Sequence, residues 1–142
     1  LLQEQKRNDK VSVDIPEGAF KIKNLNGTNF LETHGDLLGG GAGGFLGIPA
    51  YSIGQNGAKL YGVLHQINIK TENQYDHIIS GHLHTSFKIP LFNGGFCFVG
   101  GCLIGTNEFS LTRMKSVAKK EQLMLIIDSE GRLELEKNIT FD

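Results

Sequence analysis

Residues 77–84 read His-Ile-Ile-Ser-Gly-His-Leu-His, a short apolar run that ends in a glycine and two nearby histidines. The apolar run is typical of a buried strand, and the glycine allows the backbone to bend sharply where the strand ends. Two imidazoles that lie two residues apart on such a turn can point at neighbouring metal ions, and imidazole suits zinc, iron, manganese and nickel. The stretch therefore predicts a metal site at a strand end.

A second histidine follows a strand-like segment closer to the N-terminus. Residues 19–23 alternate apolar with polar side chains, Asn26-Gly27 is a turn signal, and residues 29–33 are compatible with a strand. The pattern predicts a hairpin that delivers His34 at the end of its second strand, followed by Gly35 and Asp36. Because α/β proteins place their chemistry at strand ends, we expect the two histidine motifs to belong to one site.

The rest of the chain indicates a mixed α/β fold. Apolar residues recur at helical spacing from about Gly57 to Ile69, and Pro49 suits the first turn of a helix. Strand-like segments follow at residues 96–99, 103–104, 122–127 and 132–136, and Asp128-Ser129-Glu130-Gly131 is a turn between the last two. One early helix and several late strands predict a largely antiparallel C-terminal portion.

A glycine-rich stretch lies between the first histidine motif and the helix. It holds six glycines in the eleven residues from Leu37 to Gly47, and Gly39, Gly41 and Gly44 match Gly-x-Gly-x-x-Gly. The chain has no acidic residue between Asp36 and Glu72, so the carboxylate that would bind the ribose of a dinucleotide is missing. A loop that faces the substrate beside His34, or a simple connector, fits the stretch better.

Taken in order, a strand with His-Gly, a helix, a strand with Gly-His-x-His and a run of antiparallel strands resembles the C-terminal half of the calcineurin-like metallophosphoesterases. The resemblance covers about Ala19 to Leu135, and residues 107–110 look most like phage-encoded members. It implies one side of a layered α/β/β/α sandwich, with residues 1–18 as a flexible or linker segment and residues 19–142 as the C-terminal part of the domain.

The resemblance also assigns roles to individual residues. In that family the His-Gly histidine and the first histidine of Gly-His-x-His bind one metal ion, and the last histidine binds the other. His34 and His82 would therefore hold one ion and His84 its neighbour, with Gly35 beside the substrate. Asp36 would orient an imidazole or a water as a second layer of the site, although a turn or helix-cap role suits it equally well. The two divalent ions would be manganese first, with iron, zinc, nickel or magnesium as alternatives.

The departures from the family are equally informative. The sequence contains no Asp-x-His and no Gly-Asn-His, and its sole Gly-Asp is Gly35-Asp36. Three imidazoles without the bridging carboxylate would hold two ions poorly, so we expect this chain alone to be inactive or nearly so. It also begins with Leu1, which favours a piece of a longer protein. We therefore expect the N-terminal half of the same domain as its partner, with a homo-oligomer as a further option.

Composition limits the function classes. The formal net charge of -1 argues against long-range attraction to nucleic acid or membranes, and the cations at residues 113–120 are read as a solvated face. No segment looks like a membrane span or a signal peptide, and the two cysteines suit a reducing compartment, so a cytoplasmic location is expected. We expect part of a metal-dependent hydrolase of phosphate mono- or diesters, nucleic acid included; the alternative is a non-catalytic interaction or structural module that keeps the fold.

Overall fold

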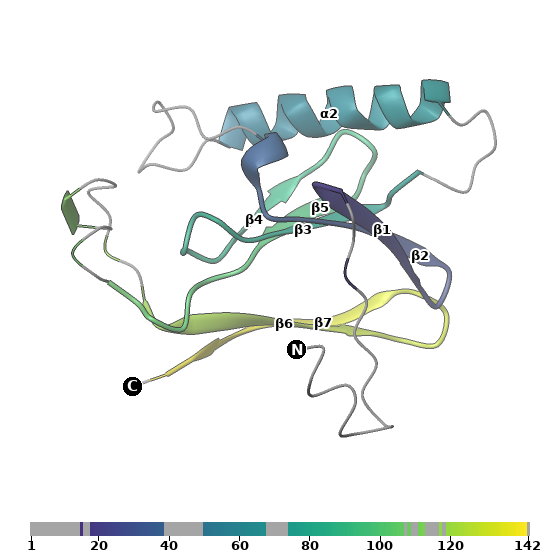
Figure 1. Ribbon diagram of the computed structural model, residues 1–142. Helices are drawn as coiled ribbons and strands as arrows, with labels where there is room; N and C mark the ends of the chain where they lie inside the picture. The colour runs from purple at the N-terminus through teal and green to yellow at the C-terminus, as the bar shows by residue number, and fades with distance from the viewer. Residues whose placement is uncertain are drawn as a thin grey trace.

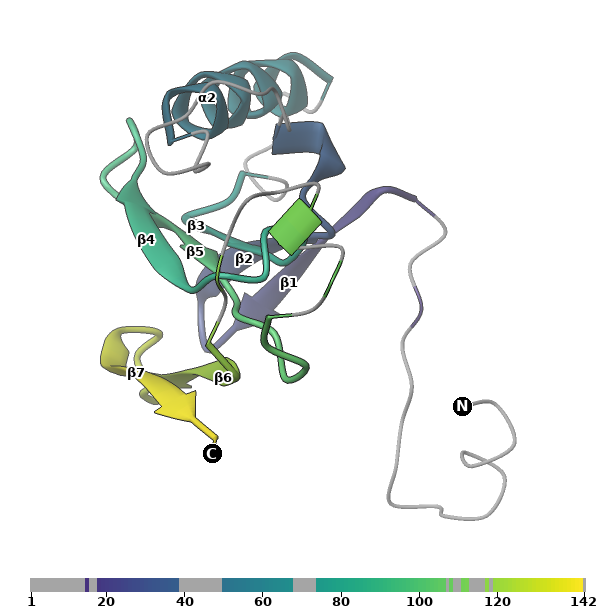
Figure 2. The same ribbon diagram turned by 90° about the vertical axis from the view of Figure 1, so that its left-hand side faces the viewer.

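The computed structural model describes residues 15, 18–38, 50–67, 74–106, 108, 111–112, 117 and 119–141. In this part of the chain, a five-stranded sheet carries a helix on one face and a two-stranded hairpin on the other (Figure 1). Figure 2 shows the same three layers after a quarter turn. The order helix, sheet, sheet supplies three layers of the expected α/β/β/α sandwich and confirms the mixed α/β class.

The larger sheet combines antiparallel and parallel pairing. Its strand order is β1-β2-β3-β5-β4, with β1 and β2 antiparallel, β2, β3 and β5 parallel, and β4 antiparallel to β5. The bounds are β1 Phe20–Leu25, β2 Thr28–Thr33, β3 His77–Ser80, β4 Phe87–Pro90 and β5 Phe96–Val99. The second sheet is the antiparallel hairpin of β6 Glu121–Ile127 and β7 Leu133–Thr140. The parallel strands β2, β3 and β5 point the same way, so their C-terminal ends meet at one edge.

Both expected hairpins are confirmed, but one strand of the structure was not predicted and one predicted strand is absent. β4 was not expected; it is a short edge strand that ends in Pro90, a residue that sheets tolerate at their edges. Leu103 and Ile104 were expected to form a strand, but they lie outside every strand with 57% and 68% of their surface exposed. The chain bends there beside Gly105, which has a φ of 72°.

The helix α2 runs from Ala50 to Ile67, so it begins about two turns before the expected start. Glycine weakens a helix interior, and Gly54 and Gly57 hid these first turns from sequence reasoning. Packing explains the early start: Ile53 is only 2% exposed in the core, and the carbonyl of Gly57 accepts a 2.6 Å hydrogen bond from the Tyr75 hydroxyl. A Cβ on Gly57 would lie 3.4 Å from Ile78, so the glycine lets the helix approach the sheet.

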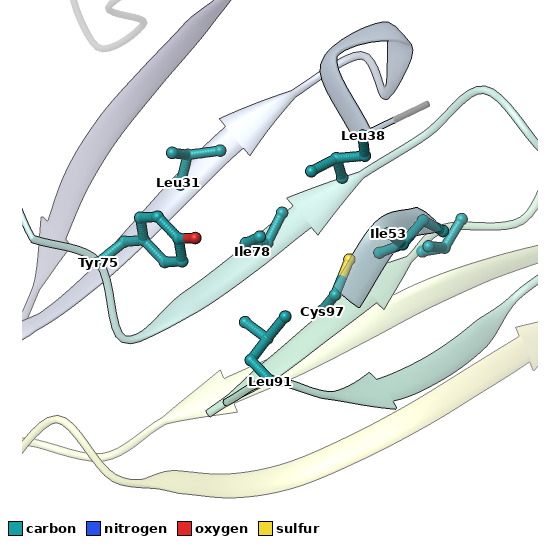
Figure 3. Close-up of a cluster of buried hydrophobic side chains, with 8 residues drawn as sticks. Leu31, Leu38, Ile53, Tyr75, Ile78, Leu91 and Cys97 are labelled. Atoms are coloured by element: carbon teal, nitrogen blue, oxygen red, sulfur yellow. The ribbon is translucent and has the colours of Figure 1, made fainter. Parts of the chain in front are cut away.

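The main hydrophobic core lies between α2 and the sheet (Figure 3). Ile78 is fully buried in it, and its neighbours on β3 point to the opposite face because side chains alternate along a strand. The buried members of this core are Leu31, Leu38, Ile53, Tyr75, Ile78, Leu91, Cys97 and Val99. No helix of the described part of the chain is long and apolar enough to span a membrane.

The opposite face of the sheet carries aromatic side chains toward the hairpin. Phe30 and Phe98 are fully buried there, and the His77 ring lies 5.2 Å from Phe30, 5.7 Å from Phe98 and 6.2 Å from Phe96 between ring centroids. The backbone N–H of Phe96 donates to Nδ1 of His77 over 3.0 Å. His77 therefore joins this second packed layer.

Two contacts attach the hairpin to the sheet at its turn. The side-chain amide of Asn26 donates to the carbonyl of Asp128 over 2.7 Å, and the Thr28 hydroxyl donates to the carbonyl of Gly131. At the other side, Lys88 on β4 forms an ion pair with Glu136 on β7. The hairpin is thus held at its turn and along β7.

Stability should depend on pH through His77. Burial lowers the pKa of His77 below its ordinary value of 6.5, although the nearby Asp76 carboxylate opposes the shift. As the pH falls through 6.5, His77 is protonated in the unfolded chain before it is protonated in the folded chain, so the free energy of unfolding should decrease. Urea unfolding at about pH 7.5 and about pH 5.5 should show a smaller pH effect in His77→Asn than in the unchanged chain. His65→Asn, at an exposed helical position, is the control, and an equal pH effect in all three proteins would contradict this account.

Candidate metal centre

The candidate site lies where β2 and β3 end side by side. His34 follows β2 directly, and residues 81–84 follow β3, as the sequence predicts. The two strands pair in parallel up to Thr33 and Ser80, and the N–H of Gly81 then donates to the carbonyl of His34 over 3.2 Å. The sheet pairing therefore continues into the site and fixes the two histidine motifs relative to each other.

Gly35 permits the close approach of the two motifs. It has a φ of 125°, and a Cβ there would lie 2.8 Å from the Ser80 hydroxyl oxygen and 3.0 Å from Cβ of His82. A side chain at this position would collide with Ser80 and His82 unless these residues shifted. The structure thus gives Gly35 a packing role, while its expected place beside a substrate stays a prediction.

The rings of His34 and His82 meet although they lie 48 residues apart in the sequence. Nε2 of His34 lies 3.1 Å from Nδ1 of His82, close enough for one ring to donate a hydrogen bond to the other. The ring planes are nearly perpendicular at 77°, with centroids 5.0 Å apart. Two imidazole nitrogens therefore point at one small region of space.

Asp36 adds a carboxylate to this pair. It begins the short 3-10 helix η1, Asp36–Leu38, which is anchored by Leu38 at 1% exposure in the core. Its Oδ1 lies 3.7 Å from Nδ1 of His82, and the side chains of His82 and Asp36 are 41% and 71% exposed. Asp36 is thus well placed either to orient the His82 ring or to bind a metal ion directly.

The group formed by His34, Asp36 and His82 fits a divalent transition metal. One ligand atom from each residue lies within 4.8 Å of the other two, and imidazole nitrogen with carboxylate oxygen is a donor set that such ions favour. Among the described residues this is the only such group of three or more ligands, so the described part of the chain offers a site for one ion. A second ion would need ligands from elsewhere.

His84 stands apart from this group. Its backbone has a φ of 57°, like that of His82 at 70°, and such angles are uncommon outside glycine. Its Nδ1 is buried with no hydrogen-bond partner among the described residues, as is the Ser86 hydroxyl oxygen. A buried imidazole nitrogen without a partner is costly, which is consistent with a ligand of a neighbouring ion but does not identify one.

A cleft that the sequence did not predict opens next to His34 and Asp36. Its volume is about 850 Å³, and it lies between the larger sheet and the inner face of β6. Most of its lining is apolar, from Phe20, Leu25, Phe30, Ile79, Leu123, Leu125 and Ile127, while Glu32, Thr33, Ser80 and Gln122 supply polar groups. Residues 122–127 give little signal for it, because every residue after Gln122 is apolar and the sequence does not show which face of β6 lines the cleft.

Other candidate residues lie away from the site or outside the described part of the chain. His65 is exposed on α2, where its Nδ1 lies 2.6 Å from the Gln74 side-chain amide nitrogen. The Gly-x-Gly-x-x-Gly match at Gly39, Gly41 and Gly44 falls outside the described residues. So do Asn107, Phe109 and Ser110 of the phage-like stretch, and Arg113 and Lys115 of the basic run.

The fold has a counterpart among solved structures. A crystal structure of a Vps29 single mutant from Entamoeba histolytica matches 93% of this chain and 67% of its own, with a TM-score of 0.50 and 11% sequence identity. At that identity the likeness concerns the fold alone, which is metallophosphoesterase-like. No model of a protein family matches the chain, and no curated protein sequence does either.

A side chain at Gly35 should disrupt the site. Gly35→Ala should lower the free energy of unfolding by about 1–3 kcal/mol, because the methyl group meets Ser80 and His82 and the backbone angle suits glycine. Gly62→Ala is the matched control: no atom lies within 4 Å of its Cβ position, so the helix should gain about 0.5–1 kcal/mol. Urea denaturation of both variants measures the difference, and equal changes would contradict the packing role of Gly35.

Proposed function

We propose that this chain is part of a metal-dependent phosphoesterase that hydrolyses phosphate mono- or diesters. The observation that carries the proposal is the meeting of His34 and His82, whose ring nitrogens lie 3.1 Å apart at the ends of two parallel strands. The metallophosphoesterase-like fold supports it. In the complete enzyme, His34 and His82 hold one divalent ion, and His84, with its unpartnered Nδ1, holds the second.

The chain's own residues bind and position the reacting groups. Divalent ions in such a centre activate a water molecule and bind phosphate oxygens, and manganese is the first choice. Gly35 allows the close approach of the two histidine motifs, and its backbone is the part that we expect beside the phosphate group. The cleft lined by His34 and Asp36 accommodates the remainder of the ester, and its apolar walls exclude water from that part of the substrate.

The complete site needs a second segment, which we infer to be the N-terminal half of the same domain. The given sequence has neither the Asp-x-His nor the Gly-Asn-His of the family it resembles. The shape of the molecule supports the same inference, because β6 pairs with β7 alone among the described strands and a two-stranded sheet is marginal in water. The cleft is lined by β6 and, within the described residues, by no part of β7. On the edge of β6 away from β7, the N–H of Glu121 donates to the carbonyl of Cys102 over 3.1 Å at the start of the strand, and no named strand of the described residues pairs with the rest of that edge.

A strand added beside β6 would therefore extend the second sheet and cover the apolar walls of the cleft. A second copy of this chain could also cover apolar surface, but it would bring the same ligands again. It could not provide the carboxylates that the sequence lacks. The N-terminal half is thus the partner that answers both needs, the unpaired strand and the missing ligands.

A non-catalytic interaction module is the second candidate. It is favoured by the outer face of the hairpin, where Ile126, Leu135 and Ile139 are 40%, 40% and 36% exposed on one side of the sheet. Apolar side chains gathered on an exposed sheet face often mark a contact with another protein. Metal content and hydrolysis separate this candidate from the enzyme.

Hydrolysis provides the direct test. The intact parent polypeptide, loaded with manganese, should hydrolyse bis-p-nitrophenyl phosphate, and His82→Ala should reduce turnover to background because an ion loses a ligand. Far-UV circular dichroism should be unchanged, since His82 is exposed. His65→Ala removes an exposed imidazole from α2 and should keep full activity. A parent protein that neither retains metal nor hydrolyses the ester would refute the enzyme and favour the interaction module.

Hydrogen exchange tests the partner. In the parent protein the outward amides of β6 should exchange at least ten times more slowly than in residues 1–142 alone, because a new strand would bind them. The amides of β2, which is paired on both sides in this chain, serve as the internal control and should change little. Equal exchange of β6 in the two proteins would place the missing segment elsewhere.

A further inference from the structure

We propose that His34, Asp36 and His82 form a complete binding site for one divalent transition-metal ion on this chain alone, with Asp36 as a direct ligand. This inference deepens the proposed function, since it concerns the same centre, but it needs neither the N-terminal half nor hydrolysis. It also differs from the role that the sequence suggested for Asp36, which was to orient an imidazole or a water.

The distances between the ligand atoms support a single ion. Two ligand atoms that each lie about 2.0–2.1 Å from a tetrahedral ion are about 3.3–3.4 Å apart, and at right angles about 2.9 Å apart. The 3.1 Å between Nε2 of His34 and Nδ1 of His82 falls inside this range. The 3.7 Å from His82 Nδ1 to Asp36 Oδ1 exceeds it, and the three ligand atoms together lie within 4.8 Å of one another, so the exposed Asp36 side chain has to turn toward the two imidazoles to reach the ion.

Charge favours Asp36 as a ligand over a site made of imidazoles alone. Neutral imidazoles leave the double charge of the ion uncompensated, whereas a carboxylate neutralises part of it. The Asp36 carboxylate has no hydrogen-bond or ion-pair partner among the described residues other than His82, so no competing cation occupies it. Two imidazoles and one carboxylate suit zinc, cobalt, iron and manganese better than magnesium or calcium, which prefer oxygen ligands.

The backbone holds the three side chains in place before any ion binds. The pairing of β2 with β3 and the contact at Gly35 set the separation of His34 and His82. The N–H of Leu38 donates to the Gly35 carbonyl over 3.0 Å, and the Leu38 side chain anchors η1, so Asp36 follows the same framework. A preformed site loses little conformational entropy on binding, which strengthens affinity.

The open side of the site faces the cleft. His34 and Asp36 line the cleft, whereas His82 lies outside its lining. An ion held by three protein ligands keeps at least one position for an outside ligand, as catalytic zinc sites do. A phosphate oxygen that enters through the cleft is the ligand we expect there, so inorganic phosphate should compete with water at the bound ion.

Cobalt titration of residues 1–142 tests the site without any activity measurement. The metal-free chain should bind one Co²⁺, seen as a visible absorption band and as one metal per chain by elemental analysis. Asp36→Asn should weaken binding by more than the roughly 10- to 100-fold expected when a group that only orients a ligand is lost. Glu134→Gln removes an exposed carboxylate from β7 and should leave the affinity unchanged.

The outcomes distinguish the alternatives. Retained binding in Asp36→Asn, together with loss in His84→Ala, would overturn the proposal and put three imidazoles at the ion. A chain that binds no Co²⁺ would show that His34, Asp36 and His82 only form hydrogen bonds with one another. Tight binding by residues 1–142, combined with an inactive parent protein, would support this site and refute the proposed hydrolysis. An active parent protein whose Asp36→Asn variant keeps its metal would support the proposed hydrolysis and refute Asp36 as a ligand.

Discussion

The close approach of two parallel strand ends at Gly35 is the constraint on which the site depends. β2 and β3 pair with each other up to their last residues, and a side chain at Gly35 would collide with Ser80 and with His82. Since the strands cannot slide without losing the buried pair Leu31 and Ile78, the two histidine motifs have a single relative position. The 3.1 Å between Nε2 of His34 and Nδ1 of His82 therefore depends on the packing of Leu31 and Ile78 on the α2 face of the sheet.

The second face of the sheet is organised differently. Toward α2 the sheet is closed by a hydrophobic core. Toward the hairpin, Phe30 and Phe98 are buried, and Phe30 also lines the open cleft of about 850 Å³. Contacts at the turn, along β7 and at Glu121, whose N–H donates to the Cys102 carbonyl, hold the hairpin, and no further named strand of the described residues pairs with β6. The described part of the molecule is therefore closed by packing on its helical side and open on its hairpin side, where the proposed further strand would lie.

Local patterns in the sequence predicted the elements that are locally determined. The Asn26-Gly27 turn, the turn at residues 128–131 and the strand-end places of His34 and His82 follow from short-range rules and are present in the structure. The start of α2 could not be predicted, because glycine has a low helix propensity. Gly57 is helical there because it packs against Tyr75 and Ile78, and Ile53 is buried in the same core. β4 and the cleft were missed for the same reason, since both depend on neighbours distant in sequence. For Asp36 the sequence left its role open, and proximity to His82 became visible only in the fold.

The location of the metal centre has a consequence for how binding and catalysis are divided. His34, Asp36 and His82 all belong to the larger sheet and its loops, which are packed against α2, and none of them belongs to the hairpin. Under the proposed function, a segment that completes the second sheet would cover the cleft, which His34 and Asp36 also line, and would leave the backbone that carries the three residues unchanged. Because the packed face of the larger sheet fixes the strands that precede these three residues, they can bind an ion before the rest of the proposed site is complete. Under the proposed function, hydrolysis would begin only when the N-terminal half closes the cleft against water and brings the second set of ligands.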